Sequence, residues 1–160
     1  MPSGIKQAFA SKLSDVDTVA RDQLGTLRFE GNKIYKYVQY KEGAAATDGV
    51  AGEVTYYYAP GGDFATLGYS GNKVTSDLSD SAEVGAGVLQ AAMSDNEYGW
   101  VQVRGPALLT IALTAGADGD ALTPTGSADG TLDVSAAVTD NVCATAEDIS
   151  AKQIICNFLL

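Results

Sequence analysis

The run KIYKYVQY, residues Lys33–Tyr40, decides the fold class of this chain. Five of its eight residues are β-branched or aromatic, the side chains that strands favour. The tripeptide Glu30-Gly31-Asn32 stands just before it and is typical of a tight turn. The stretch therefore predicts a β-strand that is entered through a turn.

The rest of the chain after Gly25 also consists of short runs of strand-forming residues, separated by glycine with asparagine, aspartate or proline. We expect the stretch 107–115 to be buried on both faces, and the stretch 132–138 to alternate between core and solvent. Some seven short strands with frequent turns predict a mainly β protein with a small barrel or sandwich as its body. The expected strands are 33–40, 53–58, 84–93, 100–104, 107–115, 132–138 and 153–160.

The first 24 residues follow a different pattern. Apolar residues recur there at steps of three and four, which places them on one face of a helix. The segment is either an amphipathic helix or an arm that becomes ordered on binding, and Gly25 ends it. We therefore divide the chain into an N-terminal arm, 1–24, and a β domain, 25–160. The periodic residues are Ile5, Phe9, Leu13, Val16, Ala20 and Leu24.

The composition is that of a globular protein, with 46% hydrophobic and 19% charged residues and 18 glycines in 160 residues. No apolar stretch is long enough to cross a bilayer, and the start lacks the apolar core of a secretion signal, so we expect no membrane partner. Residues 1–42 hold seven basic and five acidic residues, a net +2, whereas residues 43–160 hold three and 15, a net −12. Such an acidic body argues against a nucleic-acid partner. The basic front could dock on an acidic surface, or the acidic surface could serve solubility alone.

Catalytic chemistry finds little support in the sequence. The chain has no histidine, which excludes Ser-His-Asp and Cys-His devices. The loop at residues 68–72 (GYSGN) narrowly misses the G-x-S-x-G pattern, and the Asp-Gly pairs near 118–120 and 129–133 are ordinary turn formers rather than a calcium loop. We expect no enzyme activity, no cofactor and no metal. Cys143 and Cys156 are either two buried thiols or, less favoured, a disulfide.

Aromatic residues supply the remaining candidates. We assign Tyr56 and Tyr58 to the core, and Trp100 to an anchoring place in it. Tyr35, Tyr37 and Tyr57 stay open between the core and an exposed row that could stack on sugars.

Several stretches, taken in order, resemble known proteins. Residues 24–26 (LGT) and 31–39 (GNKIYKYVQ) come first, followed by 84–92 (VGAGVLQAA), 98–107 (YGWVQVRGPA) and 119–122 (GDAL). This order is similar to that of bacteriophage head decoration, or cement, proteins of the β-tulip type. The likeness covers most of residues 24–160.

The resemblance implies a β-tulip-like body and a structural role in the virion. Proteins of this kind bind the outer surface of the expanded capsid, commonly as homotrimers at local three-fold axes, and bridge neighbouring capsomers. The implied partner is the phage major capsid protein, and the implied location is the outer surface of a virion assembled in the host cytoplasm. Many weak contacts over many copies then hold the shell against its internal pressure. The segment 1–24 is longer than the arms of that family.

We expect the arm to carry the contact with the capsid, and the centre of the β domain to supply either core or contacts between protomers. The arm residues are Ile5, Lys6, Phe9, Lys12, Leu13 and Arg21, and the body residues are Trp100, Leu109, Ile111 and Leu113. Two alternatives stay open: another virion part, such as a head fibre base or tail-tube subunit, and a glycan-binding β module that uses Tyr35, Tyr37 or Tyr57.

Overall fold

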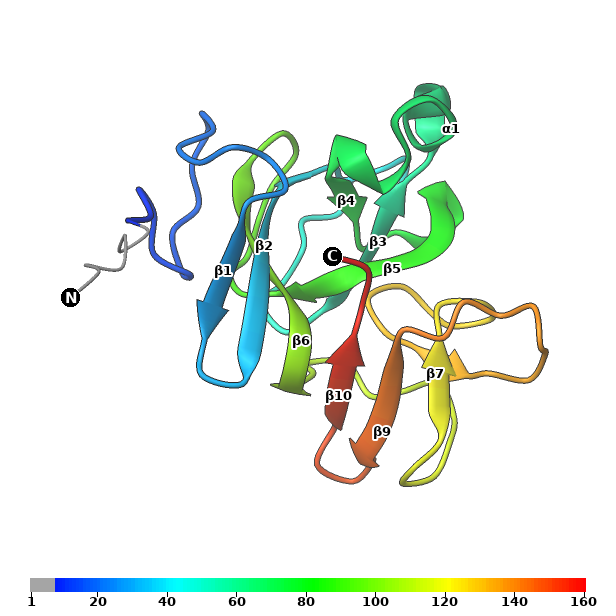
Figure 1. Cartoon of the computed structure of the whole chain (residues 1–160). Coiled ribbons are helices and arrows are strands. Elements are labelled where there is room, and N and C mark those ends of the chain that lie inside the picture. The colour runs from blue at the N-terminus through cyan, green and yellow to red at the C-terminus, as the bar shows by residue number, and fades with distance from the viewer. Residues whose placement is uncertain (1–7) are drawn as a thin grey trace.

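The computed structural model describes residues 8–160, and in this part of the chain strands dominate (Figure 1). One short α-helix, α1 (Asp63–Leu67), lies between two 3-10 turns, η1 (Pro60–Gly62) and η2 (Gly68–Gly71), and a third turn is η3 (Leu78–Asp80). None of the helices in residues 8–160 is long and apolar enough to cross a membrane. The strands are β1 (Leu27–Glu30), β2 (Lys33–Tyr40), β3 (Val54–Tyr58), β4 (Lys73–Thr75), β5 (Ser81–Leu89), β6 (Tyr98–Leu108), β7 (Ala121–Thr123), β8 (Asp133–Val134), β9 (Ala144–Asp148) and β10 (Gln153–Asn157).

Five of these strands close into a small barrel, which confirms the predicted fold class. The order around it is β2-β4-β3-β5-β6, and the pairing of β6 with β2 completes the ring. Only β2 and β4 pair in parallel; the other neighbours are antiparallel. Opposite residues on β2 and β6 include Tyr37 and Trp100. Closure leaves none of these five strands with a free edge along its whole length.

The sheet continues on both sides of the barrel. Strand β1 pairs with β2 on one side, while β10, β9, β7 and β8 follow β6 on the other (Figure 1). Strand β6 is long enough to serve both structures: its middle pairs with β2 and β5, and its end, from Arg104 to Leu108, pairs with β10. One strand thus joins the barrel to the C-terminal half of the sheet.

Apolar side chains fill two separate clusters. The larger one occupies the barrel and extends under β9 and β10, with Tyr40, Tyr56 and Leu122 fully buried. The smaller one, Tyr35, Tyr37 and Trp100, lies on the outer face of β2 and β6. Because successive side chains of a strand point to opposite faces, β2 supplies both clusters from alternate positions.

The N-terminal segment is not helical over residues 8–24, so the helical alternative is wrong there. Side-chain carboxylates compete with a helix for its backbone N–H groups. Asp15 Oδ2 accepts a hydrogen bond from Lys12 N at 2.9 Å, and Asp22 Oδ1 accepts one from Ala10 N at 3.3 Å. The spacing of apolar residues that mimics a helix serves instead to pack the segment on the body. Residues 1–7 of the expected helix lie outside the described part of the chain.

Several of the expected strands differ from the observed ones, and β10 ends at Asn157 rather than at residue 160. Strand β5 ends at Leu89, so residues 90–93 of the expected stretch 84–93 are not part of it. The expected strand 107–115 is wrong beyond Leu108, because β10 begins at Gln153 opposite that residue and offers no further partner. Of the stretch 132–138 only β8 forms, and Val138 is fully exposed.

Candidate docking surface

The arm, residues 8–24, covers the smaller aromatic cluster. The Phe9 ring lies edge-on to Trp100 with ring centroids 5.5 Å apart, and Tyr37 lies 5.1 Å from the same indole. Leu13 and Leu24 are partly buried against the cluster as well. The structure therefore places Phe9 and Leu13, which the sequence assigned to a capsid contact, against the protein's own body. Trp100 is fully buried, as its core role predicts.

Hydrogen bonds hold the arm in place on this cluster. The Trp100 indole N–H donates to Ser11 Oγ at 2.9 Å, and Ser11 Oγ donates to Asp22 Oδ2 at 2.8 Å. The backbones of Asp17 and Tyr98 exchange two hydrogen bonds, at 3.1 and 2.9 Å. A buried indole N–H that found no acceptor would cost about 1–3 kcal/mol, so Ser11 gives the arm a specific seat.

Arg28 connects the arm with β1. Its guanidinium lies 5.0 Å above the centre of the Phe9 ring and 5.9 Å from that of Trp100. Its Nη1 donates to the Ser11 carbonyl at 3.1 Å, and its Nη2 lies 2.5 Å from Glu30 Oε1. A guanidinium suits this place because it stacks on rings and donates in its own plane at the same time. The side chain is therefore committed to holding the arm.

The outward side of the arm and of β1 exposes both apolar and charged groups. Val19 is 73% exposed and Phe29 is 65% exposed. Lys12 is exposed, and the Arg21 side chain remains 55% exposed although it pairs with Asp17 at 2.8 Å. Phe29 lies on the face of β1 opposite to Arg28 and the arm, so we call only Lys12, Val19 and Arg21 the arm-side surface. The other two expected capsid-contact residues, Ile5 and Lys6, lie outside the described residues.

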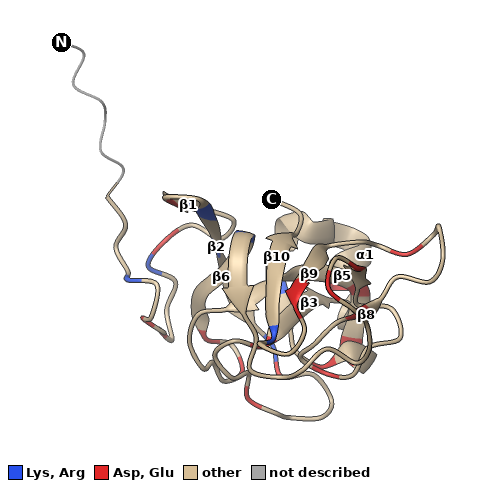
Figure 2. Ribbon diagram, turned by 90° about the horizontal axis from the view of Figure 1, so that it is seen from below, with Lys and Arg blue, Asp and Glu red and all other residues tan. Residues whose placement is uncertain are grey.

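Charge is distributed unevenly along the chain. Most of the acidic positions lie around α1, β3, β5, β8 and β9 and in the loops beside them, as Figure 2 shows. Residues 43–160 contain 15 acidic and three basic residues, whereas residues 1–42 contain five and seven. The arm itself is not basic, because residues 8–24 contain two basic and three acidic side chains.

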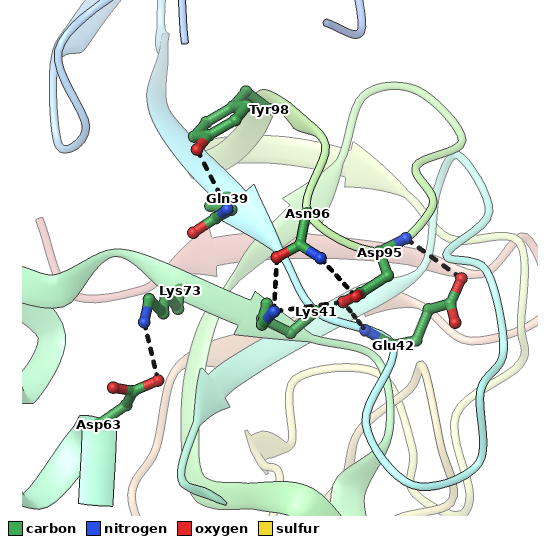
Figure 3. Close-up of polar contacts among 8 residues, drawn as sticks. All are labelled: Gln39, Lys41, Glu42, Asp63, Lys73, Asp95, Asn96 and Tyr98. Atoms are coloured by element: carbon green, nitrogen blue, oxygen red, sulfur yellow. Dashed lines mark hydrogen bonds and ion pairs between the residues drawn. The ribbon is translucent and has the colours of Figure 1, made fainter. Parts of the chain in front are cut away.

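Other cations are occupied within the chain. Lys41 Nζ donates to Asn96 Oδ1 at 2.6 Å and lies 3.5 Å from Asp95 Oδ1 (Figure 3). Asp95 and Glu42 accept one another's backbone N–H groups at 3.3 and 3.1 Å. This small network ties the end of β2 to the loop before β6, and Lys41 is not available for docking.

Tyrosine positions weaken the sugar-binding alternative. Tyr35, Tyr37 and Tyr57 are at most 5% exposed, so none of them presents a ring for stacking. Tyr56 is in the core as expected, and its hydroxyl accepts from Thr131 N at 3.0 Å. Tyr58 is only partly buried. Exposed aromatic side chains exist in the described residues, but they are Phe29 and Tyr69 rather than the predicted set.

The body residues with an expected core or protomer role lie in the chain's own interior. Leu109 is 3% exposed, and Leu113 packs against the barrel cluster from a partly buried position. Ile111 is half-buried. These residues support the core alternative, although the segment that carries them is not the expected strand.

The remaining residues that the sequence analysis considered for catalysis or metal binding either form turns or are buried and unreactive. Asp118, Asp120 and Asp129 each accept a backbone N–H, at 2.9, 2.7 and 2.8 Å. Within residues 8–160 no group of three metal-binding side chains comes together. Cys143 and Cys156 are both buried and unpaired, and burial raises the pKa of Cys156 to about 12. Thiols in such surroundings stay protonated and unreactive at neutral pH.

Sequence reasoning missed Ser11 and Arg28 as anchors, and it gave no role to Lys36. Lys36 shares the inward face of β2 with Val38 and Tyr40, and it is 3% exposed. The sequence did contain a signal, because Lys36 alternates with residues that face the core. A lysine is almost never fully buried unless its charge has a partner.

Comparisons with known proteins do not identify the chain. No protein-family model matches it. No match is found among curated proteins or among solved structures.

Proposed function

We propose that this chain is a non-enzymatic structural protein that binds the outer surface of a bacteriophage capsid and stabilises the expanded shell by bridging neighbouring capsomers. Its partner is the major capsid protein. It works as a homotrimer on the outside of the virion, where the summed contacts of many copies oppose the pressure of the packaged genome.

The observation that carries the proposal is the way the arm is held. Its inward residues, Phe9 and Leu13, are used on the Trp100 cluster, while Lys12, Val19 and Arg21 face outward. An arm that is already ordered loses little conformational entropy on docking. Apolar groups within a charged rim are also the usual anatomy of a protein interface.

The edge of the sheet supports the same reading. Among the described residues β1 pairs with β2 alone, so its second edge is open, and Phe29 is exposed on one face of this edge strand. Open edges invite the addition of a partner strand, whereas charged residues such as Arg28 and Glu30 discourage unspecific pairing. The resemblance of residues 24–160 to decoration proteins supports a capsid as the partner.

Co-sedimentation with phage shells tests the proposal. The purified protein is mixed with expanded shells that lack it, and with unexpanded shells as the control. We expect saturable binding to expanded shells only, with a stoichiometry that is a multiple of three per site. Absence of binding to both kinds of shell, by a folded protein, would contradict the proposal.

Charge reversal at one exposed cation tests the arm-side surface without disturbing the arm's seat. The variant Lys12→Glu changes an exposed side chain, keeps the ion pair of Arg21 with Asp17, and leaves Phe9, Ser11 and Leu13 on the body. We expect its affinity for expanded shells to fall at least tenfold. Lys152→Glu, a single reversal beyond β9, is the control and should change affinity less than twofold. Equal losses in both proteins would show unspecific electrostatics instead of docking by the arm.

A further inference from the structure

The Lys36 side chain is a buried cation that finds no acidic partner in the described residues. It points from β2 to the inside of the barrel and is 3% exposed. Its Nζ donates to the Tyr57 hydroxyl at 2.8 Å and lies 5.3 and 5.5 Å from the ring centres of Tyr57 and Tyr69. The four ion pairs among residues 8–160 do not include it. An ammonium has three donors, and residues 8–160 supply one acceptor.

Keeping this charge inside the fold is costly. Burial lowers the pKa of Lys36 to about 8, so the side chain is still mostly protonated at neutral pH. A buried charge without an opposite charge is several kcal/mol less favourable than an apolar side chain of the same size. The aromatic ring of Tyr69 recovers only part of this cost, on the order of 1–2 kcal/mol. Something other than the stability of the fold therefore accounts for a lysine here.

A groove opens directly above Lys36. It has a volume of about 320 Å³ and lies between the start of β1 and the η2 turn. Leu27, Tyr69 and Leu160 form apolar parts of its wall. The volume falls at the lower end of the range of about 300–1,000 Å³ that is typical of small-ligand sites.

A second polar group in the same groove lacks a partner. Asn72 lines the groove and is 5% exposed, and its Oδ1 is buried with no hydrogen-bond donor. Its Nδ2 is already used, since it donates to the Ser70 carbonyl at 2.8 Å. Buried polar atoms in folded proteins are nearly always satisfied, so an unpaired acceptor beside an underused donor points to a ligand.

We infer that this groove, the Lys36 groove, binds a carboxylate that is carried on an apolar group and has an N–H close to it. The carboxylate accepts from Lys36 Nζ and neutralises it, which is the strongest contact available to such a group. The N–H donates to Asn72 Oδ1, and the apolar part packs on Leu27 and Tyr69. N-acyl amino acids and the carboxy-terminal residue of a polypeptide share this chemistry. The inference does not depend on the capsid proposal, because a protein of any function could carry such a site.

Titration by nuclear magnetic resonance tests the site. The ¹⁵N-labelled protein at pH 6.5 receives N-acetylphenylalanine, and the matched control is N-acetylphenylalaninamide, which has the same shape without the charge. We expect saturable shifts of the backbone amides of Leu27, Tyr69 and Asn72 with the acid, and at least tenfold weaker binding of the amide. Equal binding of both, or no saturation with the acid up to 20 mM, would overturn the inference.

Two variants of groove residues and one control variant test whether Lys36 supplies the charge that binds the acid. Lys36→Met keeps the volume and should abolish binding of the acid, whereas Lys73→Met removes a half-exposed lysine that pairs with Asp63 at 2.9 Å and should leave it unchanged. Asn72→Asp adds a carboxylate to the groove and should also weaken binding at least tenfold, which keeps the test valid if Lys36→Met fails to fold. Undiminished binding in both groove variants would contradict the site.

A further titration with a peptide distinguishes the two sources of the ligand. A hexapeptide that ends in phenylalanine is compared with N-acetylphenylalanine, and each is also tested with an amidated end. Tighter binding of the free-ended peptide by tenfold or more assigns the groove to a polypeptide terminus. Equal affinities assign it to a small acid. Binding of the amidated peptide as tightly as the free one would overturn the role of the carboxylate.

Discussion

The two faces of strand β2 are both buried, but by different means. Its inward side chains, such as Val38 and Tyr40, are enclosed when the barrel closes around them. Its outward side chains, Tyr35 and Tyr37, are covered by the irregular arm. The barrel interior is enclosed by five strands paired along their backbones, whereas the arm is held by a few side chains, Ser11 among them, and by one backbone bridge between Asp17 and Tyr98. A strand can therefore be apolar on both faces when the barrel encloses one face and an irregular segment of the chain covers the other.

The largest effect should come from removing the centre of the aromatic cluster that the arm covers. Trp100→Ala empties a fully buried site and leaves Ser11 without its donor, so the free energy of unfolding should fall by about 3–5 kcal/mol. Urea denaturation followed by circular dichroism measures it. Trypsin should also cut faster after Lys12 and Arg21 once the arm loses its seat. A loss below 1 kcal/mol would mean that the arm does not contribute to the fold.

Two tyrosine-to-phenylalanine variants compare the barrel interior directly with the face of β2 that the arm covers. Tyr56→Phe removes an acceptor that Thr131 N uses inside the barrel at 3.0 Å, and should cost about 1–3 kcal/mol because no water replaces it. Tyr37→Phe removes the acceptor of Arg21 N, at 3.2 Å in the arm, where solvent is near. It should cost about 0.5–1 kcal/mol. Equal costs in thermal or urea unfolding would show that water is excluded equally well from both places.

The charge of Lys36 inside the barrel makes the free energy of unfolding depend on pH. Burial lowers its pKa to about 8 in the folded protein, below the ordinary lysine value of 10.5, so between these values the unfolded chain binds more protons and stability rises with pH. Burial of Tyr56 and Tyr57 raises their pKa values, which lowers stability above pH 10 and limits the window. Wild type should gain about 1–2 kcal/mol relative to Lys36→Met between pH 7 and 9.5. A constant difference across this range in urea titrations would contradict a charged Lys36 at neutral pH.

The smallest effect on stability is expected at Phe29, which belongs to neither buried cluster. Phe29→Ala should change the free energy of unfolding by less than about 0.5 kcal/mol because the ring is 65% exposed. Its binding to expanded shells should nevertheless weaken at least threefold in the co-sedimentation assay. Unchanged binding would mean that Phe29 takes no part in docking on the shell.

Much of the barrel could be predicted from the sequence because its strands carry their own signals. Residues 33–40 and 53–58 are rich in aromatic and β-branched side chains, and the observed β2 and β3 follow these stretches closely. The short strands β4, β7 and β9 were not predicted. They have three to five residues each and depend on neighbours far along the chain for their pairing.

The failures have a physical cause in each case. In the stretch 132–138 the carboxylate of Asp140 accepts from Ala136 N and Ala137 N at 2.8 and 2.9 Å, which takes these groups away from a sheet. The spacing of Phe9 and Leu13 fits a helix and also fits a segment laid across Trp100, and only the tertiary contact decides between them. The Lys36 groove needs barrel closure to bring Tyr57 beside β2, so no local pattern could reveal its geometry.

Electron cryomicroscopy of expanded shells saturated with the protein shows directly whether and how it binds the capsid. We expect added density at local three-fold axes, fitted by three copies with the arm-side surface against the shell and the acidic region around β8 and β9 outward. Shells without added density, or copies bound with the arm-side surface facing solvent, would contradict the proposal.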